Sequence, residues 1–173
     1  MIIKFWRESV MASCLLTIIR IYLGWQWLAS GWDKISGGKF DATGFLRAAV
    51  NHSNGDNPAV QPWWADFLNY FAIPNAGLFN LLVPWGEFLV GLGLIIGMFT
   101  SIAALMGIVM NFSYLFSGTT STGPQMVLLE ILILAASSNA AKLGFDRWVI
   151  PFLRAKITNK YSMRSVHKAY KTE

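Results

Sequence analysis

Three ionisable residues interrupt long apolar stretches of this sequence: Arg20, Glu87 and Glu130. Asn111 places an uncharged polar group in another such stretch. Charged side chains inside a bilayer cost several kcal/mol unless they are paired, so each is a candidate functional group. One arginine neutralises only one carboxylate, so either one glutamate holds a proton or a cation or ligand supplies the missing charge. A carboxyl group that exchanges a proton suits a site for a reducible ligand or a proton-coupled solute, which makes Glu87 and Glu130 the candidate catalytic residues.

The composition predicts an integral membrane protein. Of the 173 residues, 54% are hydrophobic and only 13% are charged, roughly half the charged share of a soluble domain. Apolar stretches at about residues 10–32, 76–99, 101–116 and 124–140 provide four crossings, and a membrane-spanning helix needs about 20 residues. We therefore expect an all-α fold, with a four-helix transmembrane bundle in residues 1–145 and a basic tail in residues 146–173.

The distribution of positive charge predicts the topology. Lys4 and Arg7 precede the first crossing, and eight of the 14 Lys and Arg residues lie between Lys142 and Lys171. Cations that flank crossings stay on the cytoplasmic side and are attracted to anionic lipid. We expect a multi-pass protein of the cell membrane with both ends in the cytoplasm. This clustering does not resemble a nucleic-acid-binding face, so no nucleic-acid partner is predicted.

The segment 33–75 connects the first two crossings and is predicted to cap the outer mouth of the bundle. Connections of this length without secondary structure are uncommon, so short interfacial helices are expected at about Phe40–Val50 and Trp63–Phe71. The adjacent indole rings of Trp63 and Trp64 suit the headgroup level of the bilayer, where one side of a ring is wet.

One face of the first crossing gathers the candidate binding residues. Its members are spaced by three or four positions and so share a helical stripe: Arg20, Gly24, Trp27, Gly31 and Lys34. At a rise of about 1.5 Å per residue, Arg20, Glu87 and Asn111 fall near the membrane midplane and Glu130 lies nearer the outside. Two interpretations stay open: Arg20 and Glu87 form an ion pair that only fixes helix register, or they belong to a ligand site.

Metal and disulfide chemistry is not expected. The chain has one cysteine, Cys14, and two histidines, His52 and His167. An internal disulfide or a Cys-x-x-Cys motif needs a second cysteine, and neither histidine has the partners that a metal or haem site requires. No metal or haem cofactor is therefore predicted.

Several short motifs together resemble the DoxX/DoxD family of small four-helix membrane proteins. They are Arg20-Ile-Tyr-Leu-Gly24, Ser30-Gly31-Trp32-Asp33-Lys34, Gly86-Glu87 and the glycine-rich run from Gly91 to Gly97. The resemblance covers about residues 15–145 and implies a membrane subunit of an oxidoreductase, because members include the large subunit of thiosulfate:quinone oxidoreductase and others are linked to thiol redox homeostasis. It also implies that the functional positions are Arg20, Gly24, Gly31, Lys34 and Glu87.

The leading hypothesis is a quinone-interacting membrane subunit of the thiosulfate or thiol type. Arg20 and Lys34 would attract a quinone carbonyl or a small anionic sulfur substrate, Glu87 or Glu130 would relay protons, and Trp27 and Trp32 would flank the ring. The side chains form no redox-active set, so electrons would pass through a bound quinone or a second oxidoreductase subunit.

The alternative is a non-catalytic membrane binding, transport or assembly protein. In it the same polar interior, including Asn111, holds a lipid, a small solute or a partner helix. Four short helices leave much lipid-facing surface, which also leaves room for a homodimer.

Overall fold

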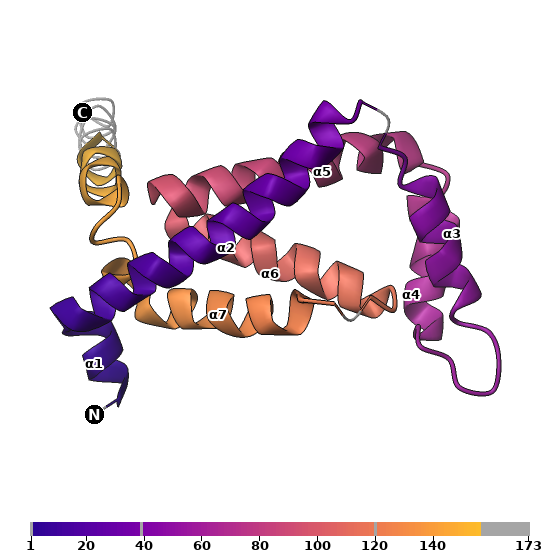
Figure 1. The fold of residues 1–173 in the computed structure, drawn as a ribbon, viewed down its shortest axis with the longest axis horizontal. Helices are drawn as coiled ribbons and strands as arrows, with labels where there is room; N and C mark the ends of the chain where they lie inside the picture. The colour runs from indigo at the N-terminus through magenta and orange to yellow at the C-terminus, as the bar shows by residue number, and fades with distance from the viewer. Residues whose placement is uncertain (1, 39, 120, 157–173) are drawn as a thin grey trace, which may run out of the picture.

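The computed structural model describes residues 2–38, 40–119 and 121–156, and every regular element among these residues is helical. Four long helices form the body: α2 (Val10–Ser36), α5 (Ala76–Ile96), α6 (Thr100–Phe116) and α7 (Gly123–Ala136) (Figure 1). They lie where the four crossings are predicted, although α2 continues to Ser36 and α5 ends earlier, at Ile96.

The short helices lie at the two ends of this body (Figure 1). At one end, α3 (Thr43–Asn51), α4 (Pro62–Phe67) and a π-helix (Leu68–Ala72) form a cap. At the other end lie α1 (Ile2–Glu8) and a helical segment at 146–156, neither of which is predicted from the sequence. A 3-10 turn (Ser137–Asn139) follows α7. The part of the predicted basic tail at 157–173 lies outside the described residues.

Helices α2 and α5 pack closely because glycines face each other. A Cβ atom built on Gly24 would lie 2.9 Å from the carbonyl oxygen of Gly91, and one built on Gly31 would lie 2.8 Å from that of Pro84. Small residues allow backbones in membrane proteins to approach in this way. The fully buried side chains Leu16, Leu23 and Leu94 fill the core beside this contact.

The sharp connection between α5 and α6 depends on two residues with a left-handed backbone conformation and on one carboxylate. Gly97 ends α5 with φ 72°, a conformation that glycine adopts without steric cost, and Phe99 follows with φ 53°. The carboxylate of Asp146 then accepts hydrogen bonds from the backbone N–H groups of Phe99 (2.7 Å) and Thr100 (2.9 Å). The first amides of α6 are thereby satisfied by a residue from the far end of the chain.

The outward faces of the long helices are apolar. Ile18 of α2, Leu89 of α5 and Leu128 of α7 are 65%, 59% and 66% exposed. Helices that are apolar on all sides belong in lipid or in the core of a large protein. Among the described helices, α2 and α5 are long and apolar enough to cross a membrane, and α6 and α7 are shorter apolar helices.

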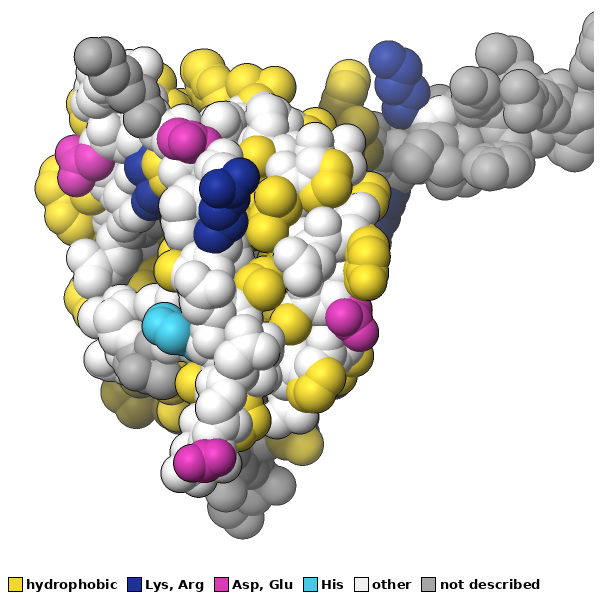
Figure 2. Space-filling view, turned by 90° about the vertical axis from the view of Figure 1, so that its right-hand side faces the viewer, with side chains coloured by type: hydrophobic (Ala, Val, Ile, Leu, Met, Phe, Trp, Pro, Cys, Tyr) yellow, Lys and Arg dark blue, Asp and Glu magenta, His cyan; other side chains and the backbone are white. Residues whose placement is uncertain are grey.

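The cap has a small core of its own and hydrogen bonds to the ends of the long helices. Leu46, Ala49 and Leu68 are buried together, and the indole N–H of Trp64 donates to the hydroxyl of Ser117 at the end of α6 (2.9 Å). Before α3, hydrogen bonds from Thr43 hold the pKa of Asp41 below its usual value. The surface at this end mixes polar and hydrophobic side chains with only scattered charges (Figure 2).

Candidate functional site

A cavity of about 540 Å³ lies between the cap and the neighbouring ends of the long helices. Aromatic rings from the cap segment and α5 provide much of its wall: Phe40, Phe45, Trp64, Phe67 and Phe79. Polar side chains from three long helices also line it, among them Ser30 and Lys34 of α2, Glu87 of α5, and Asn111 and Tyr114 of α6. An apolar chamber with a few converging polar groups is the usual form of a small-molecule site.

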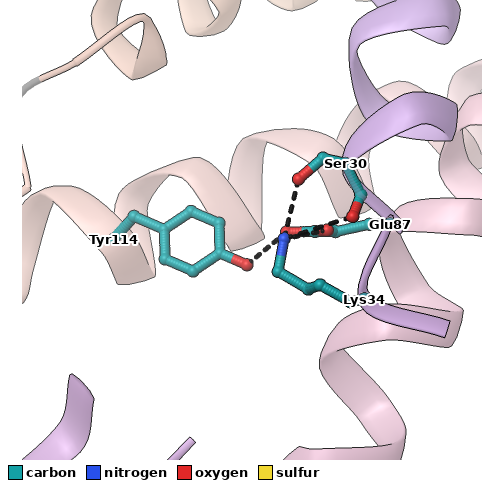
Figure 3. A network of polar contacts seen from close by, with 4 residues as sticks. All are labelled: Ser30, Lys34, Glu87 and Tyr114. Carbon is teal, nitrogen blue, oxygen red and sulfur yellow. Dashed lines mark hydrogen bonds and ion pairs between the residues drawn. The ribbon is translucent and has the colours of Figure 1, made fainter. Parts of the chain in front are cut away.

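Lys34, Glu87, Tyr114 and Ser30 form one connected cluster in this cavity (Figure 3). The ammonium of Lys34 lies 2.6 Å from Oε2 of Glu87, and the hydroxyl of Tyr114 donates to Oε1 of the same carboxylate, also at 2.6 Å. Lys34 donates further to Oγ of Ser30 (2.7 Å) and, weakly, to the Ser30 carbonyl oxygen (3.4 Å). The carboxylate of Glu87 is 2% exposed, whereas the side chain of Lys34 is 25% exposed. The cluster therefore pairs its buried negative charge with a cation that faces the cavity.

Glu130 is a second buried carboxyl group with neutral partners. Its Oε1 accepts from the indole N–H of Trp27 (2.8 Å), and its Oε2 accepts from the amide of Asn111 (3.1 Å). It packs against Gly107, where any Cβ atom would collide with the carboxyl group. No Lys, Arg or His among the described residues lies within ion-pair distance of it. Trp27 and Asn111 line the cavity, so Glu130 is connected to the cavity through them.

The expectation that Arg20 pairs with Glu87 is wrong. The Arg20 guanidinium donates to the carbonyl oxygen of Ala140 (3.1 Å) and packs against Gly97 and Gly144. Gly97 follows the end of α5, so Arg20 lies at that end of the helix and not level with Glu87 near the middle. The reason is distance along α2: Arg20 and Lys34 are 14 positions apart, about 21 Å at 1.5 Å per residue, and only Lys34 reaches the carboxylate.

Three other predicted binding residues do not line the cavity: Gly24, Gly31 and Trp32. Gly24 and Gly31 are buried against α5 and do not line the cavity. Trp32, predicted to flank a ring together with Trp27, points away from the cavity, is 55% exposed and packs on Phe88. Five residues along a helix turn a side chain by about 140°, so the two indoles cannot face the same space.

Sequence reasoning missed two polar residues of the structure. Tyr114 is three residues after Asn111 and therefore on the same helical face, a signal that identifies it as a partner for a buried carboxylate. Asp146 follows the last predicted crossing, and its contact with the start of α6 connects positions about 46 residues apart. No local pattern carries that signal.

Comparison with known families decides the identity of the chain. The sequence model of the DoxX family matches residues 15–119, which is more than half of the chain. The chain belongs to the DoxX family. No curated protein and no solved structure matches it at a significant level.

The DoxX match includes most of α2 and all of the cap, α5 and α6, and thus every residue of the Lys34–Glu87–Tyr114 cluster. Together with the apolar outward faces, it identifies a membrane protein. Among the described residues of this DoxX protein, no three His, Cys, Asp or Glu side chains lie close enough together to hold a metal ion.

Proposed function

We propose that this DoxX protein is the quinone-binding membrane subunit of an oxidoreductase that oxidises thiosulfate or thiols. The observation that carries the proposal is the position of Lys34, Glu87 and Tyr114 at the edge of an aromatic-walled cavity. A quinone has the matching chemistry, a flat apolar ring with carbonyl oxygens that accept hydrogen bonds.

The residues present fit such a ligand. A volume of about 540 Å³ lies within the roughly 300–1,000 Å³ typical of small-molecule sites. The ammonium of Lys34 has three N–H groups, and its weakest bond, at 3.4 Å to the Ser30 carbonyl, is the one that a ligand carbonyl would replace. The rings of Trp27 and Phe45 provide apolar surface for the ring and its tail.

The side chains supply orientation and protons. When bound, a quinone supplies an acceptor for two electrons and two protons. The ammonium of Lys34 would hold one carbonyl oxygen, donate a proton to it and take up a replacement proton from solvent at the cavity. The Glu87 carboxylate, which accepts from both Lys34 and Tyr114, would keep these two donors in position. Glu130, which is buried with only the neutral donors Trp27 and Asn111, is the second group proposed to hold a proton. The electrons come from a thiol or thiosulfate, oxidised with formation of a sulfur–sulfur bond on a second subunit or a soluble partner.

The proposed membrane arrangement has all four long helices as crossings and both ends in the cytoplasm. It rests on the positive charges at 4–7 and 142–156 and on the position of α1 and segment 146–156 at the same end (Figure 1). The cap and the cavity then face the outer side. The exposed apolar faces of α2 and α5 leave room for a second copy of the chain.

Binding of decylubiquinone, followed by quenching of tryptophan fluorescence in nanodiscs, tests the proposal. Trp27 and Trp64 line the cavity and report on an occupant. Lys34→Gln and Tyr114→Phe should each weaken binding about tenfold, since each removes a hydrogen bond that involves a charged group. Arg47→Gln, a charge loss on the exposed surface of α3, should leave the affinity unchanged. Wild-type affinity in both cavity variants would rule out the site.

A non-catalytic role is the second candidate, and one observation favours it. The single cysteine, Cys14, is exposed on α2, away from the cavity, and so offers the cavity no thiol for electron transfer. The same cavity would then hold a lipid or small solute for binding, transport or assembly. Mass spectrometry of the purified protein separates the two: a co-purified quinone supports the first candidate, and a phospholipid in its place supports the second.

A further inference from the structure

A second cavity, of about 770 Å³, lies at the end of the molecule opposite the cap. It is bounded by α1, the start of α6 and the helical segment 146–156, which lie at the same end of the body (Figure 1). It shares no lining residue with the cavity that contains Lys34 and Glu87. Nothing in the proposed quinone chemistry uses it.

The charged side chains that line this second cavity are mainly cationic. Four cations line it, Arg7, Lys142, Arg147 and Arg154, beside two acids, Glu8 and Asp146. Both acids already have partners, because Glu8 pairs with Lys4 at 4.0 Å and Asp146 accepts the backbone N–H groups at the start of α6. With four cations against two acids, the lining has a net positive charge.

Three of the cations have donor groups to spare. Lys142 and Arg147 are exposed, and neither side chain makes a hydrogen bond or ion pair with the described residues. Arg7 uses its Nε to donate to the carbonyl oxygen of Ala135 (3.0 Å), which orients the guanidinium and leaves the terminal N–H groups for another acceptor. Such groups suit a phosphate, whose several oxygens accept from more than one cation.

The surroundings of the cavity are those of a membrane surface. Trp148 and Phe152 on segment 146–156 are 63% and 66% exposed, and Trp148 packs edge to face on Phe145. A short helix with exposed aromatic rings and cations lies naturally at the boundary between headgroups and acyl chains. The apolar residues Phe99, Ile102 and Ile150 line the cavity itself, so an occupant with a phosphate and an apolar tail would contact cations and apolar side chains together.

We propose that this cavity binds the phosphate of an anionic phospholipid, with Arg7, Lys142 and Arg147 as its ligands and the apolar lining residues Phe99, Ile102 and Ile150 against the acyl chains. Basic pockets beside membrane helices on the cytoplasmic side are suited to such headgroups. Binding of one headgroup by Arg7 and Arg147 would hold α1 and segment 146–156 at the same depth in the headgroup region of the membrane. The inference needs the membrane placement of the chain but not the binding of a quinone.

Native mass spectrometry of the full chain, titrated with dioleoyl phosphatidylglycerol, tests the site. Dioleoyl phosphatidylcholine, with the same acyl chains and a zwitterionic headgroup, is the ligand control. Each cation removed should weaken binding about fivefold, so Arg7→Gln with Arg147→Gln should lower the affinity roughly 25-fold. Arg47→Gln on α3, a matched loss of charge at the other end, should change nothing.

Three results would overturn the proposal. They are wild-type affinity of the double variant, equal binding of the two lipids, and displacement of phosphatidylglycerol by an equal concentration of inorganic phosphate, which would assign the cavity to a soluble anion. If loss of the Arg7 contact with Ala135 prevents folding, Lys142→Gln with Arg147→Gln carries the same test, because neither side chain is bonded to the described residues. Decylubiquinone affinity, measured on the same samples, should be unchanged, which separates this site from the cap cavity.

Discussion

At the scale of single residues, the contact between Lys34 and Glu87 is the one whose loss should destabilise the protein most clearly. Lys34→Met leaves the Glu87 carboxylate buried without its cation. We expect the free energy of unfolding to fall by about 2–3 kcal/mol, less than the roughly 3–5 kcal/mol of a fully buried pair because the Lys34 side chain is 25% exposed. Unfolding in detergent, followed by circular dichroism, measures the change.

A double variant shows whether the loss comes from the stranded charge. Lys34→Met with Glu87→Gln removes both charges and should recover most of the stability, since a neutral pair of similar volume has no uncompensated ion. Lys4→Met, which breaks an exposed pair with Glu8 at 4.0 Å, is the matched control and should have little effect. A double variant as unstable as Lys34→Met alone would show that the stranded charge of Glu87 is not the cause of the lost stability.

The residue scale also shows what a single sequence can predict about the site. The cost of charge in an apolar stretch identifies Arg20, Glu87 and Glu130 correctly as buried polar groups. Their partners depend on distances between helices, which spacing within one helix does not determine. Arg20 was expected to contact Glu87 and instead bonds the Ala140 carbonyl, in a turn that has no pattern of its own.

At the scale of elements, the close contact of α2 with α5 depends on Gly91. A Cβ atom there would lie 2.7 Å from the Gly24 carbonyl oxygen and from Cα of Leu28. Both are backbone atoms, so a change of side-chain rotamer cannot relieve the contact. Gly91→Ala should therefore push the helices apart and lower the free energy of unfolding by roughly 1–3 kcal/mol, the usual cost of overpacking. The same detergent unfolding experiment measures it.

Gly77 provides a control within the same helix. A Cβ atom on Gly77 would meet nothing within 4 Å, so Gly77→Ala should leave stability unchanged or raise it slightly by restricting the unfolded chain. Equal stability of Gly91→Ala and Gly77→Ala would mean that α2 and α5 are not in close contact.

Element positions follow the apolar pattern better than element ends do. Each of the four long helices overlaps one predicted stretch, because runs of apolar residues are the dominant signal in this sequence. The end of α5 depends on a backbone conformation: Gly97 adopts φ 72° and stops the helix before the apolar run stops. Helix α1 and segment 146–156 are short and charged, so neither has the apolar length of a membrane crossing.

At the scale of the whole molecule, two cavities occupy opposite ends of one helical body. The cap cavity combines an ion pair with aromatic walls, and the far cavity presents cations beside exposed rings. Helix α2, 27 residues and about 40 Å long, reaches both ends, whereas α7, with 14 residues and about 21 Å, is shorter than the bilayer core of about 30 Å. The buried residues Asn139 and Ala140 continue the chain beyond α7 within the protein, and in the proposed four-crossing arrangement they shield the end of α7 from lipid.

The proposed orientation predicts which end a membrane-impermeant maleimide can reach. In a Cys14→Ser background, which removes the one native thiol, Ser53→Cys places a thiol beyond α3 in the cap and Lys156→Cys places one at the opposite end. The thiol at position 53 should be labelled in intact cells, because the positive charges at 4–7 and 142–156 hold the other end in the cytoplasm. The thiol at position 156 should be labelled only after the membrane is opened.

The reverse pattern would invert the orientation and place the cationic cavity at the outer surface. Labelling of both thiols in intact cells would show that an odd number of helices cross, and the short helix α7 would then be the one that does not.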